Sequence, residues 1–210
     1  AVRLLAAQTV AEIGGPSSIL YLATALRDPG SDEVRQVASD ALRNAPAEAL
    51  VGASAQVIPA LSAALRDDKW QVYYAARDAL AKMGPPAVPV LTQALASPEA
   101  RVGHMAQLAL TRIGAAAVPG LTKALLTGDE RTRNWASIAL GEIAEPAVNA
   151  LSQIVTSGSA SAPARAAAAR ALGATGMDGA LPPLKQAASA PDPLVRVAVL
   201  RGMAKLDNAD

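Results

Sequence analysis

The stretch VYYAARDALAKMG, residues 72–84, returns as VGHMAQLALTRIG at residues 102–114. Counted from Val72, apolar residues occupy offsets 0, 3, 4, 7, 8 and 11 in both copies, which is the spacing of one face of an α-helix. The residues at the other offsets differ between the copies. We therefore expect a helix that packs its constant face against neighbouring helices and turns its variable face to water or a partner.

The same pattern recurs along nearly the whole chain. The residues equivalent to Val72 follow one another at intervals of 30 to 38 and are Val2, Val34, Val102, Thr132, Ala164 and Val195. A glycine or alanine ends four of these helices, at Gly14, Gly84, Gly114 and Ala144, as is typical of a helix C-terminus. A fixed interval of this length predicts an array of stacked structural repeats.

A shorter helix is predicted before each of these longer ones. It reads VIPALSAAL at 57–65, AVPVLTQAL at 87–95 and AVPGLTKAL at 117–125. Its recurring prolines are expected in the first helical turn, where the missing N–H has no role, and they are Pro59, Pro89, Pro119 and Pro182. Each repeat is therefore a helical hairpin, which needs its neighbours to bury its apolar stripe.

Helices that read like V-R-x-x-A-A-x-A-L-x-x-I-G after V-P-x-L resemble HEAT repeats. The thirty-residue spacing is similar to the short HEAT-like repeats of phycobilisome lyase subunits and of many bacterial proteins. The resemblance implies an all-α fold, a right-handed α-α superhelix of about six and a half hairpins and 13 helices. It implies one solenoid over 1–210, with units near 1–14, 16–44, 57–84, 86–114, 116–144, 146–174 and 179–207.

Two irregularities interrupt the array. Residues 43–56 are an insertion, for which we weigh a longer loop with an extra helical turn against a partner-contacting segment. The first helix, 2–13, lacks a preceding partner helix, so upstream repeats or a capping chain are expected to cover its outer face near Leu4 and Leu5. The polar residues 206–210 are expected to end the array.

Composition excludes several classes of protein. The net charge is +1, from 19 basic and 18 acidic residues, which gives no global field to attract nucleic acid. The chain has no Cys and one His, so no metal site, thiol chemistry or cofactor is predicted. No apolar run is long enough to span a membrane. The compartment stays open, with the cytoplasm favoured over the periplasm.

The candidate binding residues lie on the second helices of the hairpins. Offsets 2 and 5 are expected to line the concave inner side, where the middle of the chain places Tyr74, Arg77, His104, Gln107, Asn134 and Ser137. Trp70, Tyr73 and Tyr74 form the only aromatic cluster and are the predicted hot spot, because Trp, Tyr and Arg dominate protein-binding surfaces. The alternative is an ordinary solvated polar face.

No catalytic residue is predicted. A Ser–His–Asp arrangement would need Ser137 and Asp78 to converge on His104 across different repeats, about 10 Å apart. Acidic residues in the turns and arginines at the helix starts, among them Arg35, Arg101 and Arg131, are expected to pair between repeats. We therefore expect a non-enzymatic scaffold that binds a protein partner. The alternatives are a subunit of a bilin chromophore lyase or isomerase, implied by the resemblance, and a HEAT-type nucleic-acid-binding protein.

Overall fold

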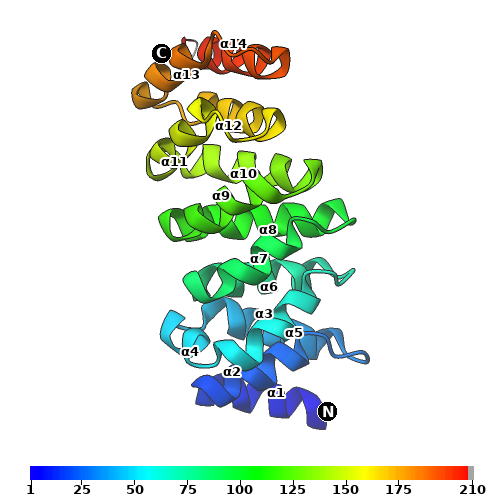
Figure 1. The fold of residues 1–210 in the computed structure, drawn as a ribbon. Coiled ribbons are helices and arrows are strands. Elements are labelled where there is room, and N and C mark those ends of the chain that lie inside the picture. The colour runs from blue at the N-terminus through cyan, green and yellow to red at the C-terminus, as the bar shows by residue number, and fades with distance from the viewer. Residues whose placement is uncertain (208–210) are drawn as a thin grey trace. The chain divides into compact units, whose positions relative to one another are not determined.

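The computed structural model describes residues 1–207, which form helices and no strands (Figure 1). The polar end predicted at 206–210 therefore lies largely outside the described residues. The chain divides into two compact units, one of residues 1–94 with 99–109 and the other of residues 95–98 with 110 onward. The fold class is all-α, as predicted, and each unit is a stack of helical hairpins.

The first unit holds two layers of helices. One layer contains α1 (Val2–Ile13), α3 (Asp32–Asn44) and α6 (Trp70–Met83), and the other contains α2 (Pro16–Ala25), α5 (Ser54–Ala64) and α7 (Val88–Ala94). Successive helices of a layer pack on each other, and α2 and α5 also pack on the helices that follow them, α3 and α6. The short η1 (Pro85–Ala87) precedes α7, and α8 (Ala100–Ile113) begins in this unit.

The second unit repeats this arrangement. The longer helices α10 (Glu130–Ile143), α12 (Ala162–Ala174) and α14 (Pro193–Asp207) pack side by side. Their partner helices α9 (Val118–Thr127), α11 (Glu145–Thr156) and α13 (Leu181–Ala187) form the second layer, with η2 (Gly114–Ala117) before α9 and η3 (Asp178–Ala180) before α13. The main contacts within residues 110–207 are therefore between neighbouring hairpins, as expected of a repeat array.

The apolar stripe that predicted the fold is the core. In α6, Val72, Ala75, Ala76, Ala79 and Leu80 are 0% exposed and Met83 is 1% exposed. The equivalent residues of α8, from Val102 to Leu110, are buried as well. Most buried positions of α12 are alanines, so its backbone lies close to its neighbours. The prediction that constant positions make the contacts between helices is confirmed.

The insertion at 43–56 contains one extra helix, α4 (Ala47–Gly52), in addition to the predicted helices. Leu50 of α4 is fully buried, and α4 packs on α2 and α6. The expected extra helical turn is therefore present. The insertion also lengthens α5, which begins at Ser54 and places Pro59 at its sixth residue. The predicted first-turn position of Pro59 is wrong because the inserted residues supply an earlier helix start, whereas Pro89, Pro119 and Pro182 do lie at the second residue of their helices.

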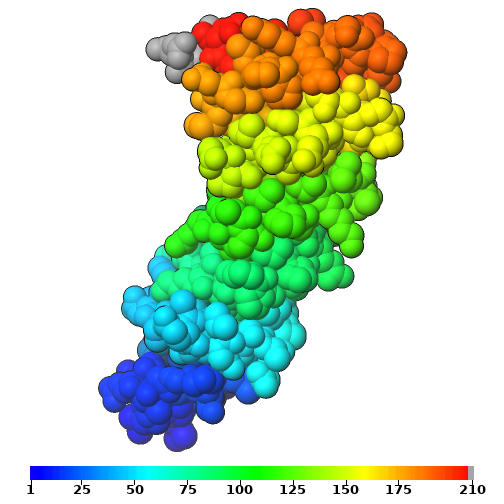
Figure 2. Space-filling view, turned by 60° about the vertical axis from the view of Figure 1, so that its left-hand side comes forward, coloured from blue at the N-terminus to red at the C-terminus, as the bar shows by residue number. Residues whose placement is uncertain are grey.

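Several apolar side chains of α1 are exposed, and the upstream repeats or capping chain expected to cover Leu4 and Leu5 stay a prediction. Val2, Leu5 and Ile13 are 83%, 66% and 72% exposed, although their equivalents Val72, Ala75 and Met83 in α6 are buried. In the space-filling view the N-terminal residues, in blue, form one end of the first unit (Figure 2). Apolar residues at these offsets are therefore buried only where another hairpin packs against them.

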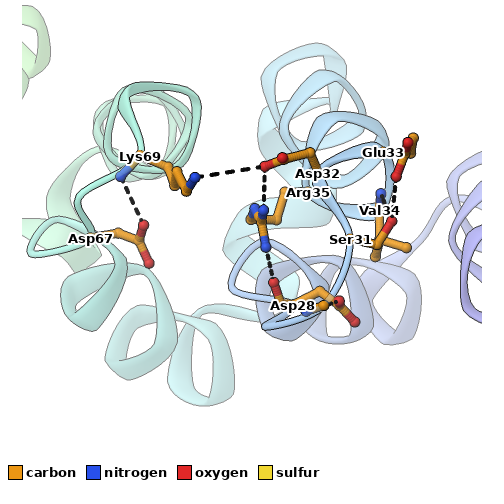
Figure 3. A network of polar contacts seen from close by, with 9 residues as sticks. Asp28, Ser31, Asp32, Glu33, Val34, Arg35, Asp67 and Lys69 are labelled. Carbon is orange, nitrogen blue, oxygen red and sulfur yellow. Dashed lines mark hydrogen bonds and ion pairs between the residues drawn. The ribbon is translucent and has the colours of Figure 1, made fainter.

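The turns carry the predicted links between hairpins, although backbone carbonyls are the main partners of the arginines. The carboxylate of Asp32 contacts Arg35 of its own helix and lies 4.0 Å from the ammonium of Lys69 in the next hairpin (Figure 3). Arg35 also donates to the carbonyl of Asp28. The hydrogen bond and charge of Arg35 hold the pKa of Asp32 below its usual value. Similar links join Arg3 to Asp28 at 3.3 Å and Arg27 to Asp67 at 3.6 Å.

Turn residues also cap the N-termini of the helices that follow them. The side chain of Asp129 accepts a hydrogen bond of 2.8 Å from the backbone N–H of Thr132, at the start of α10. Hydrogen bonding with the Thr132 side chain, and then with its backbone N–H, lowers the pKa of Asp129. Ser31 and Ser161 accept equivalent bonds at the starts of α3 and α12. The polar turn residues therefore have two roles. They cap the helix that follows them, and some also link neighbouring hairpins.

Ala144, at the end of α10, has a backbone conformation that is adopted by a glycine at the equivalent position of other repeats. Its φ is 62° and its ψ is −120°, close to the 69° and −133° of Gly84. This region costs a residue with a Cβ about 1–3 kcal/mol. Replacing Ala144 with glycine is therefore expected to raise the free energy of unfolding by about 1 kcal/mol, after the greater freedom of glycine in the unfolded chain is subtracted.

Chemical denaturation measures this change. The matched variant is Gly84→Ala, which places the Cβ in open space and therefore isolates the backbone cost. It is expected to lower the free energy of unfolding by a similar amount. A loss of stability in Ala144→Gly would contradict the explanation.

Candidate functional site

The first turn of α6 presents three aromatic side chains. Trp70 and Tyr74 are four residues apart and so share one side of the helix, with ring centroids 6.3 Å apart in an edge-to-face arrangement. The Tyr73 and Tyr74 centroids are 4.8 Å apart. Trp70 is 56% exposed, and both tyrosines are partly exposed. The predicted aromatic cluster therefore exists and is open to water.

Two arginines lie over the tyrosine rings. The guanidinium carbon of Arg77 lies 4.8 Å from the centroid of Tyr74, and that of Arg101, at the start of α8, lies 4.6 Å from the centroid of Tyr73. A guanidinium over an aromatic face is attracted by the ring quadrupole. Each tyrosine ring therefore has a guanidinium over one face. We call Trp70, Tyr73, Tyr74, Arg77 and Arg101 the α6 cluster.

Arg77 is anchored by its neighbour in sequence. Its Nε and Nη2 donate to Oδ1 of Asp78 at 2.9 Å and 2.7 Å. Asp78 is only 9% exposed, and a buried carboxylate needs such a partner. Arg77 is therefore engaged in holding Asp78 and keeps little freedom to approach a ligand.

Arg101 is anchored by the end of α5. Its Nη1 donates to the carbonyl of Leu65 at 3.1 Å, and its Nη2 donates to that of Arg66 at 3.3 Å. These carbonyls at the helix C-terminus lack partners within the helix and carry its partial negative charge. The carboxylates of Asp68 and Glu99 lie 3.9 Å and 3.8 Å from Nη2. Arg101 was predicted only as a link between repeats. Its contact with Tyr73 was not predicted, because the two residues are 28 positions apart in the sequence.

The predicted row at offset 5 does not face solvent. Gln107 and Ser137 are 2% and 4% exposed, and Ser39 is fully buried. The Ser39 hydroxyl donates to the carbonyl of Gln71 in the next hairpin at 3.4 Å. Offset 5 therefore lies against the following hairpin, and the prediction that this row lines an open surface is wrong for these residues.

The remaining predicted residues lie on separate helices. His104 is exposed on α8. Asn134 is exposed on α10 in the second unit, where its carbonyl accepts a 2.8 Å hydrogen bond from the hydroxyl of Ser137. Within residues 1–207, no group of three or more His, Asp or Glu side chains could hold a metal ion. No helix in that range is long and apolar enough to cross a membrane.

Family models account for most of this architecture. The model of HEAT repeats matches residues 88–162 and 148–210, which together make up more than half of the chain. The chain belongs to the HEAT-repeat family. The model of the PBS lyase HEAT-like repeat also matches residues 72–97, which include most of the α6 cluster. The predicted family and repeat type are therefore confirmed.

Several solved structures are similar to this HEAT-repeat chain, at low sequence identity. The archaeal HEAT-like repeats protein from Thermococcus onnurineus NA1 shares 11% identity, over 98% of this chain and 93% of its own, with a TM-score of 0.47. Human deoxyhypusine hydroxylase in complex with glycerol shares 20% identity, over 97% and 89%, with a TM-score of 0.46. An engineered protein shares 21% identity, over 91% and 97%, with a TM-score of 0.40. No curated protein matches the sequence. The family assignment therefore rests on the family models.

Proposed function

We propose that this HEAT-repeat chain is a non-enzymatic scaffold that binds a protein partner through the α6 cluster. The observation that carries the proposal is Trp70, which is 56% exposed beside two tyrosine rings that are already fixed by arginines. Tryptophan, tyrosine and arginine are the residue types most enriched in binding hot spots. Burial of such a side chain by a partner removes a large apolar area from water.

The rigidity of the cluster also favours binding. A side chain that is ordered before binding loses little conformational entropy when the partner arrives. Tyr73 and Tyr74 are stacked under Arg101 and Arg77, and both arginines are held in turn by hydrogen bonds. The cluster therefore presents a partner with a preformed aromatic surface next to cationic groups.

The test compares partner capture by matched variants. Proteins retained by the wild-type chain from an extract of its source organism are first identified, and affinity for the purified partner is then measured. The double variant Trp70→Ala with Tyr74→Ala is expected to bind at least about 30-fold more weakly, which is the loss of one strong hot spot. Its melting temperature is expected to stay close to that of the wild type, because Trp70 is largely exposed.

The control is Tyr21→Ala, because Tyr21 is the one tyrosine outside the cluster and is 37% exposed. It is expected to leave the affinity unchanged. Arg77 is left intact, because its removal would take two hydrogen bonds from the buried Asp78. Equal affinity of the wild type and the double variant would place the binding surface elsewhere.

A second candidate function follows from the match of residues 72–97 to the PBS lyase HEAT-like repeat. In that case the chain would be a subunit of a bilin lyase or isomerase, and the α6 cluster would hold the chromophore. Mixing the purified chain with a free bilin separates the two functions. A change in bilin absorbance that is lost in the Trp70→Ala with Tyr74→Ala variant would favour the lyase subunit and contradict the scaffold.

A further inference from the structure

A groove of about 500 Å³ lies between α1 and α3 in the first unit, away from the α6 cluster. Ile19 and Leu22 of α2 are each 2% exposed and form part of its apolar lining. The rest of the lining comes from α1, α3 and the turns after them, and it includes Ala11, Glu12, Asp40 and Asn44. Two of the lining residues are acidic and none is basic, in a chain whose net charge is +1.

The electrostatics of the groove favour a cation. Glu12 and Asp40 are both exposed at its rim. The groove also receives the C-terminal end of α1, and a helix C-terminus carries partial negative charge. Asp40 accepts one hydrogen bond, 2.9 Å from Nε2 of Gln36. The apolar lining suits a cation on an aliphatic chain better than a bare metal ion.

The equivalent position between α3 and α6, one hairpin further on, shows which cation fits there. Lys82, near the end of α6, donates from Nζ to the carbonyls of Arg43 and Ala45 at the end of α3, the latter at 3.3 Å. An ammonium therefore closes the C-terminal end of the preceding helix in that layer.

At the equivalent position between α1 and α3, no lysine is present. Lys82 stands ten residues after Val72, and the residue ten after Val34 is Asn44. Asn44 lines the groove, but its side chain is shorter and neutral. The α1 residues equivalent to Arg43 and Ala45 are Ala11 and Ile13, of which Ala11 lines the groove.

We propose that the α1–α3 groove binds a lysine side chain presented by a partner protein. The aliphatic stem lies against Ile19 and Leu22, and the ammonium lies between the end of α1 and the carboxylates of Glu12 and Asp40. The bound lysine takes the position that Lys82 occupies one hairpin further on. The inference does not depend on the function proposed for the α6 cluster.

The test is a titration of the full chain with short peptides, followed by the backbone amide resonances in NMR spectra. The probe peptide carries a single lysine between glycines, and its match replaces the lysine with norleucine, which has the stem but no ammonium. The lysine peptide is expected to shift amide resonances in α1 and α3. The norleucine peptide and an arginine peptide are expected to bind at least about tenfold more weakly.

Two variants locate the site. Asn44→Lys supplies the missing ammonium from within the chain and is expected to weaken the lysine peptide by at least about tenfold while preserving the fold. The double variant Glu12→Gln with Asp40→Asn is expected to weaken binding of the lysine peptide by a similar factor, because it removes negative charge at exposed positions. Equal binding of the norleucine peptide, equal binding of the arginine peptide, or undiminished binding to both variants would overturn the proposal.

Discussion

Replacing Gly173 with alanine is expected to lower the free energy of unfolding by about 3 kcal/mol or more, as overpacking does where the neighbours cannot move. A Cβ at Gly173 in α12 would lie 2.4 Å from Cα of Gly202 and 2.7 Å from its carbonyl oxygen in α14. Both contacts are with backbone, so no side chain can turn aside. A Cβ at Gly202 would in turn meet the carbonyl oxygen of Ala169 at 2.7 Å. The two helices must therefore separate to accept one methyl group.

Hydrogen exchange of the α12 and α14 amides, together with chemical denaturation, measures this loss. The control is Gly158→Ala, in the turn before α12, where an added Cβ meets nothing within 4 Å. This control is expected to change stability by less than about 0.5 kcal/mol. Equal stability of Gly173→Ala and the wild type would mean that α12 and α14 adjust freely at this contact.

Replacing Leu80 with alanine is expected to cost about 2–5 kcal/mol, the usual range for a leucine removed from a packed core. Leu80 is 0% exposed in α6, and its helix packs on α3, α4 and α5. The side chain belongs to the stripe that recurs along the sequence. The lost volume is bordered by several helices, so the surroundings can collapse only in part.

The matched control for Leu80 is Leu20→Ala in α2, because Leu20 is 40% exposed and the same atoms are removed. It is expected to cost less than half as much as Leu80→Ala. Because stability in a repeat array depends mainly on neighbouring hairpins, hydrogen exchange should accelerate most in α3, α5 and α6. Acceleration of equal size in α12 and α14 would contradict this local coupling.

The repeat stripe made the fold predictable because burial follows helical periodicity directly. Val72, Leu80 and Met83 share one face, and only a neighbouring hairpin can bury that face. The same reasoning found Gly84 and Ala144 as helix ends, since their left-handed φ values follow from the chain reversal. Local spacing carries this information without knowledge of distant contacts.

The candidate site was predictable only in part. Trp70, Tyr73 and Tyr74 are close in sequence, so their clustering follows from one helical turn. The burial of Gln107 depends on how the helix is rotated within the array, because offset 5 lies at the border between the contact face and solvent. The stacking of Arg101 on Tyr73 depends on a contact between hairpins, which spacing within one helix does not reveal.

The nearest-neighbour packing of the helices also bears on how the chain folds. The hydrogen bond from Lys82 to the carbonyl of Arg43 spans 39 residues, and it joins adjacent hairpins of the same unit. Folding of such an array can start at any pair of adjacent hairpins and spread from there. Each unit can therefore begin to form during synthesis as soon as two consecutive hairpins have left the ribosome, before the remaining residues have been made.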